Sequence, residues 1–91
     1  MAYFKINEPN KEVKYIKDVD RQNETLTFST SKNKHCYQED EGFYADSAFD
    51  FLMFHFKDKY PELQYMEIDT KYAYEEDAGT EVEVLEPQEV F

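Results

Sequence analysis

The residues of this chain that could do chemistry are mainly carboxylates. Of its 91 residues, 21 are Asp or Glu, against 10 Lys or Arg, 2 His and one Cys, so the formal net charge is −11. The acids gather late in the chain: residues 39–91 hold sixteen Asp or Glu and three Lys, whereas residues 1–38 have a net charge of +2. A field of this sign attracts basic surfaces and repels phosphate backbones. We therefore expect a basic protein partner and no direct binding to nucleic acid.

Eight carboxylates are candidates for contacts with such a partner. Glu81 and Glu83 alternate with valines in "TEVEVLE", a pattern typical of a half-buried strand. They would project from one face about 6–7 Å apart, a separation of the same order as neighbouring phosphates on one nucleic-acid strand. The other six form two clusters, Glu39, Asp40 and Glu41, and Glu75, Glu76 and Asp77. Such an array could mimic the charge of a nucleic acid; the alternative is an acidic surface that only keeps a small protein soluble.

Tyrosines accompany these acids. Tyr37 and Tyr44 flank the first cluster, and Tyr72 and Tyr74 precede the second. Tyr is enriched at interface hot spots because it offers a large apolar ring with a polar end. Tyr72 and Tyr74 are therefore candidate partner-binding residues, with a place in the core as the alternative.

The sequence contains no motif for a metal site or a phosphate-binding site. Zinc sites need three or four Cys or His ligands at suitable spacing, and His35, Cys36 and His55 do not have it. Phosphate-binding loops are rich in glycine, but this chain has only Gly42 and Gly79, far apart. We expect no metal site and no cofactor.

The sequence also gives no clear motif for calcium binding or for catalysis. The run "EEDAGTEVEVLE" resembles a calcium loop in its spacing of acids, yet its glycine falls one position early and no helix follows. The serines have no nucleophile motif around them, and with 21 acids the proximity of two carboxylates carries little information. We expect that the protein is not an enzyme.

Strands and one helix must position these residues. A short apolar stretch at residues 3–6 and the alternating residues 13–19 predict strands. The polar run 20–24 between residues 13–19 and "TLTFS" predicts a β-hairpin. "ELQYMEID" and "TEVEVLE" predict two further strands, and the loop 30–40 has no clear period.

The principal helix is predicted over residues 46–60. Asp46 or Ser47 could cap its start, Lys57 and Lys59 suit its last turn, and Pro61 stops it. Strands around one long helix indicate a small single α+β domain, with the helix packed on a mostly antiparallel sheet. We expect this domain to span residues 1–87 and residues 88–91 to form a mobile tail.

The block "FDFLMFHF" divides into two faces on a helical wheel. Most of its large side chains form one core stripe, whereas Phe51, Phe54 and His55 fall outside it. Either another part of this chain covers them, such as the loop 30–43 or the last strand, or they form an apolar patch for a partner or a second copy. We favour cover by this chain, and keep Phe51 and Phe54 as candidate partner-binding residues.

The two stretches "KYIKDVDRQNETLTFSTSKNKHCY" and "DFLMFHFKDKYPELQYMEID" together resemble small uncharacterised proteins encoded by phages and prophages of Gram-positive bacteria. The shared pattern is a hairpin, an apolar helix that ends before "YPE", and a strand. In that gene neighbourhood, small acidic proteins often inhibit host defence or host DNA enzymes, as anti-CRISPR proteins and DNA mimics do. The resemblance therefore implies an inhibitor.

These observations predict a small, acidic, non-enzymatic binding protein that engages a basic surface of a host DNA-handling or defence protein. The alternative is a self-associating module, a homodimer for example, whose acids only confer solubility. The lone Cys36, the lack of a long apolar run and the lack of a secretory signal favour a cytoplasmic protein without a membrane partner.

Overall fold

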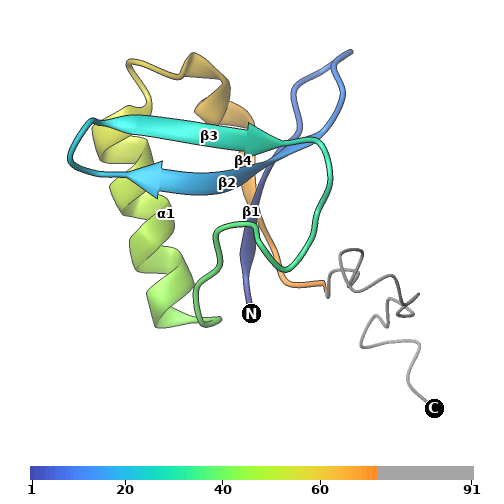
Figure 1. Ribbon diagram of the computed structural model, residues 1–91, viewed down its shortest axis with the longest axis vertical. Coiled ribbons are helices and arrows are strands. Elements are labelled where there is room, and N and C mark those ends of the chain that lie inside the picture. The colour runs from blue at the N-terminus through green and yellow to red at the C-terminus, as the bar shows by residue number, and fades with distance from the viewer. Residues whose placement is uncertain (72–91) are drawn as a thin grey trace.

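Within residues 1–71, the fold consists of a four-stranded antiparallel sheet, one α-helix and a short 3-10 helix. The computed structural model describes residues 1–71, and α1 packs on one face of a sheet ordered β3-β2-β1-β4 (Figure 1). The α+β architecture predicted from the sequence is confirmed. The elements in chain order are β1 (Tyr3–Ile6), β2 (Lys14–Asp20), β3 (Thr25–Ser29), α1 (Phe43–Phe56), the short 3-10 helix η1 (Pro61–Tyr65) and β4 (Met66–Asp69).

The predicted hairpin is present as β2 and β3, with an irregularity that explains the imperfect alternation of β2. Ile16 pairs with Phe28 and Asp18 with Thr27, so Lys17 is an extra residue between two rungs of the ladder. Such a bulge shifts the alternation of side chains by one position. Ile16 and Val19 therefore both reach the core although they are three positions apart.

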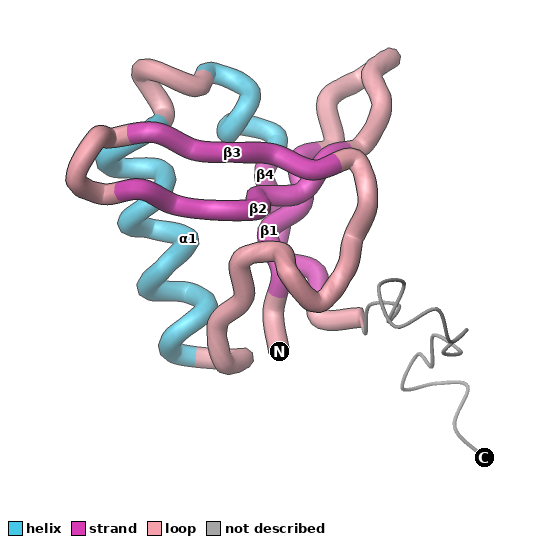
Figure 2. Tube along the Cα trace, viewed as in Figure 1, coloured by secondary structure: helices cyan, strands magenta, loops and turns pink. Residues whose placement is uncertain are grey.

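The loop after β3 returns to the sheet between the diverging ends of β1 and β2. The N–H of Tyr37 donates to the carbonyl of Ile16 at 3.1 Å, and Glu39 exchanges two backbone hydrogen bonds with Ala2, at 2.7 and 3.0 Å. Figure 2 shows this loop crossing the front of β1 before it turns into α1. The first acidic cluster is therefore held at the start of the helix.

Helix α1 begins at Phe43, three residues before the predicted start. Gly42 caps it with φ 84° and ψ −129°, a conformation that glycine adopts readily. Asp46 and Ser47 were predicted as caps, but they lie inside the helix, where the N–H of Asp46 already donates to the carbonyl of Gly42. A glycine with no side chain to donate or accept is a weak signal in a sequence, which is why the prediction missed this start.

The helix ends at Phe56, four residues before the predicted end. The N–H groups of Lys59 and Tyr60 both donate to the carbonyl of Phe56, so the chain turns there. Tyr60 itself is extended, with φ −125° and ψ 79°, because the ring of Pro61 disfavours helical geometry in the preceding residue.

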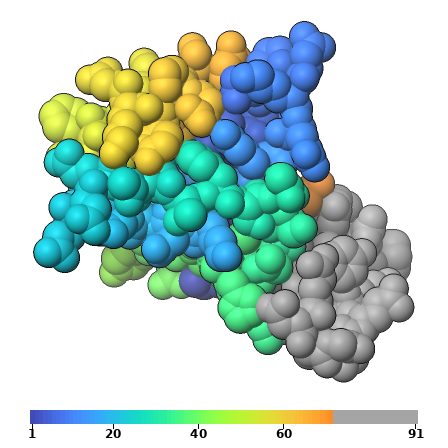
Figure 3. Space-filling view, turned by 45° about the horizontal axis from the view of Figure 1, so that its top comes forward, coloured from blue at the N-terminus to red at the C-terminus, as the bar shows by residue number. Residues whose placement is uncertain are grey.

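The strand predicted over residues 62–69 is wrong in its first half and confirmed in its second. Pro61, in the first turn of η1, begins a 3-10 helix that runs to Tyr65, and only Met66–Asp69 form β4. The ion pair between Lys14 and Glu62, at 3.0 Å, ties η1 to the start of β2. In Figure 3 the loop after β1 (blue) and the η1 region (yellow to orange) lie side by side.

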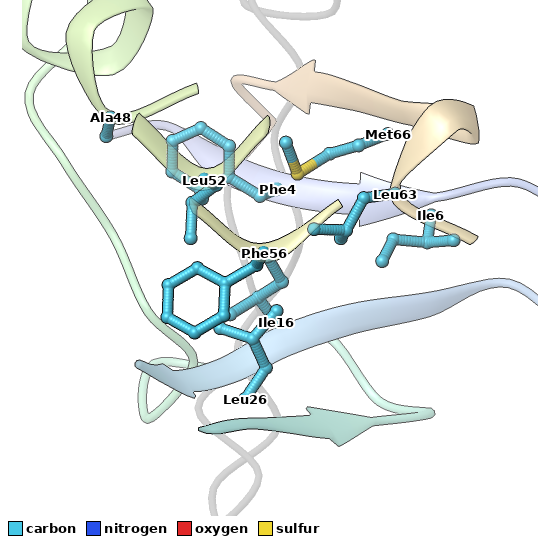
Figure 4. Packing of buried hydrophobic residues seen from close by; sticks show 9 residues of the cluster. All are labelled: Phe4, Ile6, Ile16, Leu26, Ala48, Leu52, Phe56, Leu63 and Met66. Atoms are coloured by element: carbon cyan, nitrogen blue, oxygen red, sulfur yellow. The ribbon is translucent and has the colours of Figure 1, made fainter. Parts of the chain in front are cut away.

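The core lies between the sheet and α1. Strand residues of one face meet helix residues spaced three to four positions apart, as expected for an amphipathic helix on a sheet (Figure 4). Burying these side chains is the main stabilising contribution to the domain. The buried cluster consists of Phe4, Ile6, Ile16, Leu26, Ala48, Leu52, Phe56, Leu63 and Met66.

The opposite face of the sheet carries a polar contact. Lys32, from the loop after β3, pairs with Asp69 at 3.1 Å, and its ammonium lies 5.1 Å from the ring centre of Tyr3. The side chains of Lys32 and Asp69 are only 13% and 9% exposed. This pair anchors the loop to the end of β4.

Candidate functional site

The first acidic cluster is anchored at one end and open at the other. Glu39 is half-buried, and its carboxylate accepts a hydrogen bond from the hydroxyl of Tyr37. Asp40 is exposed, and Glu41 is exposed with its carboxylate 3.2 Å from the amino terminus. Asp40 can therefore reach a partner, whereas Glu41 is already paired and Glu39 mainly holds the loop.

Tyr37 does not present its hydroxyl to a partner. Burial, and then the carboxylate of Glu39, raise the pKa of Tyr37 to about 12, so the hydroxyl stays protonated and keeps donating. Its ring lies 5.6 Å from the ring of Phe4 and packs against the core. Of the two tyrosines that flank this cluster, only Tyr44 is an exposed aromatic, at 61%.

A groove between α1 and β4 brings two further carboxylates together. It has a volume of about 580 Å³ and is lined by residues of both elements. Neither Asp46 nor Asp50 has an ionic partner among the described residues. The groove therefore joins apolar side chains with carboxylates that are free to pair. Its lining is Asp46, Phe49, Asp50, Met66, Glu67 and Ile68.

Helix geometry explains why these side chains share one side of α1. Residues four apart lie on the same face of a helix, so Asp46 and Asp50 project together. Phe49 is adjacent to them on the flank turned toward β4, and it is half-buried against the core. The sequence signal for this site is the helical spacing of two acids in residues 39–50, which contain five acids and no Lys or Arg. The sequence interpretation missed this pair of acids because it assigned Asp46 as a helix cap.

Glu67 contributes differently from the two helix acids. It pairs in register with Lys5 of β1, and its carboxylate lies 3.2 Å from the ammonium of Lys5. That charge is already compensated. The groove thus combines an apolar floor, two carboxylates that no described residue pairs with, and the edge of β4, the outermost described strand.

Phe51 and Phe54 have different surroundings. The guanidinium of Arg21, from the hairpin turn, lies 4.0 Å from the ring centre of Phe51, and the ring also packs against Phe56. Phe51 is half-buried, and the hairpin turn covers it in place of the predicted loop 30–43. The last strand, the other predicted cover, lies outside the described residues. Phe54 is 84% exposed and touches only the His55 ring among the aromatic contacts of the described residues.

Phe43 is an exposed aromatic that the sequence interpretation missed. It is 77% exposed, and its ring packs edge-on against Tyr44 at 5.7 Å between centres. The sequence predicts a loop at this position, before the helix. As the first residue of α1 it lies on the same outward face as Phe54, because eleven helical positions return to within about 20° of the starting direction.

Seven of the predicted site residues lie outside the part of the chain that the structure describes: Tyr72, Tyr74, Glu75, Glu76, Asp77, Glu81 and Glu83. The strand predicted over residues 80–86 and the tail predicted over 88–91 also lie there. Within residues 1–71, no group of three or more His, Cys, Asp or Glu is placed to hold a metal ion. No helix in that part is long and apolar enough to cross a membrane.

Comparison of the chain with protein-family models, curated proteins and solved structures found no match. The function must therefore be inferred from the arrangement of its own residues.

Proposed function

We propose that this protein is a non-enzymatic binding protein whose acidic face engages a basic surface of a protein that handles nucleic acid. The observation that carries the proposal is the groove beside β4, where Asp46 and Asp50 lie over an apolar floor and have no ionic partner within residues 1–71. Asp40 extends the same sign of charge toward the start of α1. The ionisable groups among the described residues that line the groove are all carboxylates, which are the natural partners of Lys and Arg.

Electrostatics supports this partner class. A protein that binds nucleic acid presents Lys and Arg arranged for a polyanion, and a folded array of carboxylates offers a field of the same sign. The array is already ordered, because Glu39 is bonded to the sheet and the two Asp residues lie on a helix. Preorganisation lowers the entropic cost of binding. The resemblance to small phage proteins favours an inhibitor of such a target.

The test measures binding to a panel of purified bacterial DNA-binding proteins, with double-stranded DNA as competitor. We expect at least one of these proteins to bind at low ionic strength. Its affinity should fall steeply as salt is added, and DNA should displace it from the complex. Failure of every basic protein to bind at low ionic strength would sink the proposal. Salt-independent binding would also contradict it.

Paired charge variants locate the surface. Asp46→Asn with Asp50→Asn should weaken binding by about tenfold, as expected for lost charge-assisted contacts. The matched control, Asp18→Asn with Asp58→Asn, removes the same charge from exposed positions elsewhere and should leave affinity nearly unchanged. Charge reversal at Glu81 and Glu83 tests the predicted array outside the described residues in the same assay.

A second candidate function, self-association, is favoured by the exposure of Phe54 and Phe43. Both lie on the outward face of α1, with Ser47 and Asp50 between them. In a two-fold antiparallel pair of helices, Phe43 of one copy would meet Phe54 of the other. The net charge of −11 on each copy opposes this association.

Salt separates the two candidates. Screening weakens the attraction between this protein and a basic partner, but it relieves the repulsion between two copies of this chain. Self-association therefore predicts a dimer whose dissociation constant, measured by sedimentation equilibrium, falls as salt is added. The Phe54→Ala variant should not form this dimer. A monomer at high concentration and high salt would rule it out.

A further inference from the structure

We infer that the groove beside β4 accepts an extended segment of the partner, which adds a strand to the open edge of β4 and carries Lys or Arg at alternate positions. The inference rests on the proposed function and specifies the chemistry of the segment that is bound.

The edge of β4 can accept a strand. Among the described residues, β4 has a neighbour on one side only, because it follows β1 at the end of the sheet. The N–H of Asn7 donates to the carbonyl of Tyr65, one position beyond the Ile6 and Met66 pair. Bonded and non-bonded pairs alternate in an antiparallel ladder, so the N–H and C=O of Ile68 point away from β1, toward the open edge.

The groove matches the two parts of a Lys or Arg side chain. Phe49, Met66 and Ile68 supply apolar surface for an aliphatic stem, and the carboxylates of Asp46 and Asp50 supply partners for its charged end. Long basic side chains bury the stem and keep the charge at a polar rim in this way. A neutral apolar segment would leave both carboxylates without a partner.

The spacing of the two acids fits a strand. Four helical positions separate Asp46 and Asp50 by about 6 Å along α1, and alternate residues of a strand are about 6.6–6.8 Å apart on one face. Figure 1 shows α1 rising in the same general direction as β1, so it runs roughly opposite to its antiparallel neighbour β4. Two basic residues on one face of an added strand can therefore each reach one carboxylate.

Charge selects a partner's segment over other occupants. The run at residues 80–86 of this chain carries Glu81 and Glu83 at alternate positions, where the groove favours cations. A second copy would bring its own Asp46 and Asp50 toward the same pair. Both would add like charges at short distance, which is unfavourable.

The experiment titrates the full chain with short synthetic peptides at fixed ionic strength, followed by fluorescence anisotropy. One peptide alternates Arg with Thr and Val, a second has the same composition with its Arg residues consecutive, and a third is the alternating peptide with N-methylated backbone amides. We expect the alternating peptide to bind tighter than both others, on the order of tenfold. Asp46→Asn with Asp50→Asn should remove this preference, whereas Asp18→Asn with Asp58→Asn should retain it.

Hydrogen exchange of the Ile68 amide, followed by NMR, is the second readout. Slower exchange with the alternating peptide, and not with the N-methylated one, supports the added strand. Equal affinity for alternating and consecutive Arg, with no change at Ile68, overturns it while leaving the proposed binding of basic proteins in place. An Ile68 amide already protected in the free protein also overturns it. If no basic peptide or basic protein binds, both proposals fail.

Discussion

Two phenylalanines, two positions apart, have opposite roles in α1. Phe56 is 1% exposed in the core cluster, whereas Phe54 is 84% exposed. Phe56→Ala should lower the free energy of unfolding by about 3–5 kcal/mol through lost burial and the cavity left behind. Phe54→Ala should change it by less than about 0.5 kcal/mol. Urea denaturation of both variants checks this, and a large loss in Phe54→Ala would mean that something covers its ring.

The Lys32 and Asp69 pair should make stability depend on pH in acid. Burial alone would raise the pKa of Asp69, but the Lys71 backbone N–H and the Lys32 ammonium together lower that pKa below its ordinary value of 3.8. A carboxylate with a lowered pKa stabilises the folded state above that ordinary value, and the contribution is lost as pH falls through the folded pKa.

Lys32→Met tests this at a single residue. We expect it to lower the free energy of unfolding at neutral pH by about 1–3 kcal/mol, because Asp69 keeps its charge and loses a partner. This loss of unfolding free energy should be smaller at about pH 3, because the carboxyl of Asp69 is then protonated in a larger fraction of the molecules. Urea denaturation at both pH values measures the difference. An equal deficit at both would show that lost packing of the lysine stem is responsible.

At the scale of elements, the start of α1 depends on the backbone of Gly42. Its φ of 84° favours glycine, and no heavy atom beyond Gly42 and its two chain neighbours lies within 4 Å of the position that a Cβ would occupy. Gly42→Ala should therefore lower the free energy of unfolding by about 1–2 kcal/mol through backbone strain alone. Ser47→Ala, at an exposed position inside the same helix, is the control, and it should be neutral or slightly stabilising. Equal stability of the two variants would contradict the assignment of Gly42 as the cap.

At the scale of the whole molecule, charge should limit stability at low salt. All ten Lys and Arg lie in residues 1–71 with fourteen Asp and Glu, so the net charge there is −4, and the remaining seven acids bring the chain to −11. Raising the ionic strength from about 0.01 to 0.15 M shortens the screening length from about 30 to 8 Å. The urea midpoint should rise because repulsion among the excess carboxylates is screened more than the buried Lys32 and Asp69 pair. A falling midpoint would show that the ion pairs dominate.

The sequence by itself determined those features that depend on neighbouring residues. The hairpin followed from alternation and a polar turn, the existence of α1 from its apolar residues and from Pro61, and the acidic character from composition. Each of these is a constraint on a short stretch of backbone or a plain count. The helix ends were less predictable, because a glycine cap and a turn at Phe56 leave only weak local signals.

Only the tertiary structure decided which side chains can meet a partner. Phe51 and Phe54 are equivalent in sequence, but Arg21 from the distant hairpin turn covers the first and leaves the second exposed. Likewise, Asp46 and Asp50 share a groove with an open strand edge only because β4, some twenty residues later, is the outermost described strand and lies beside them. Burial and pairing depend on contacts between residues far apart in the chain, and no local pattern reports those contacts.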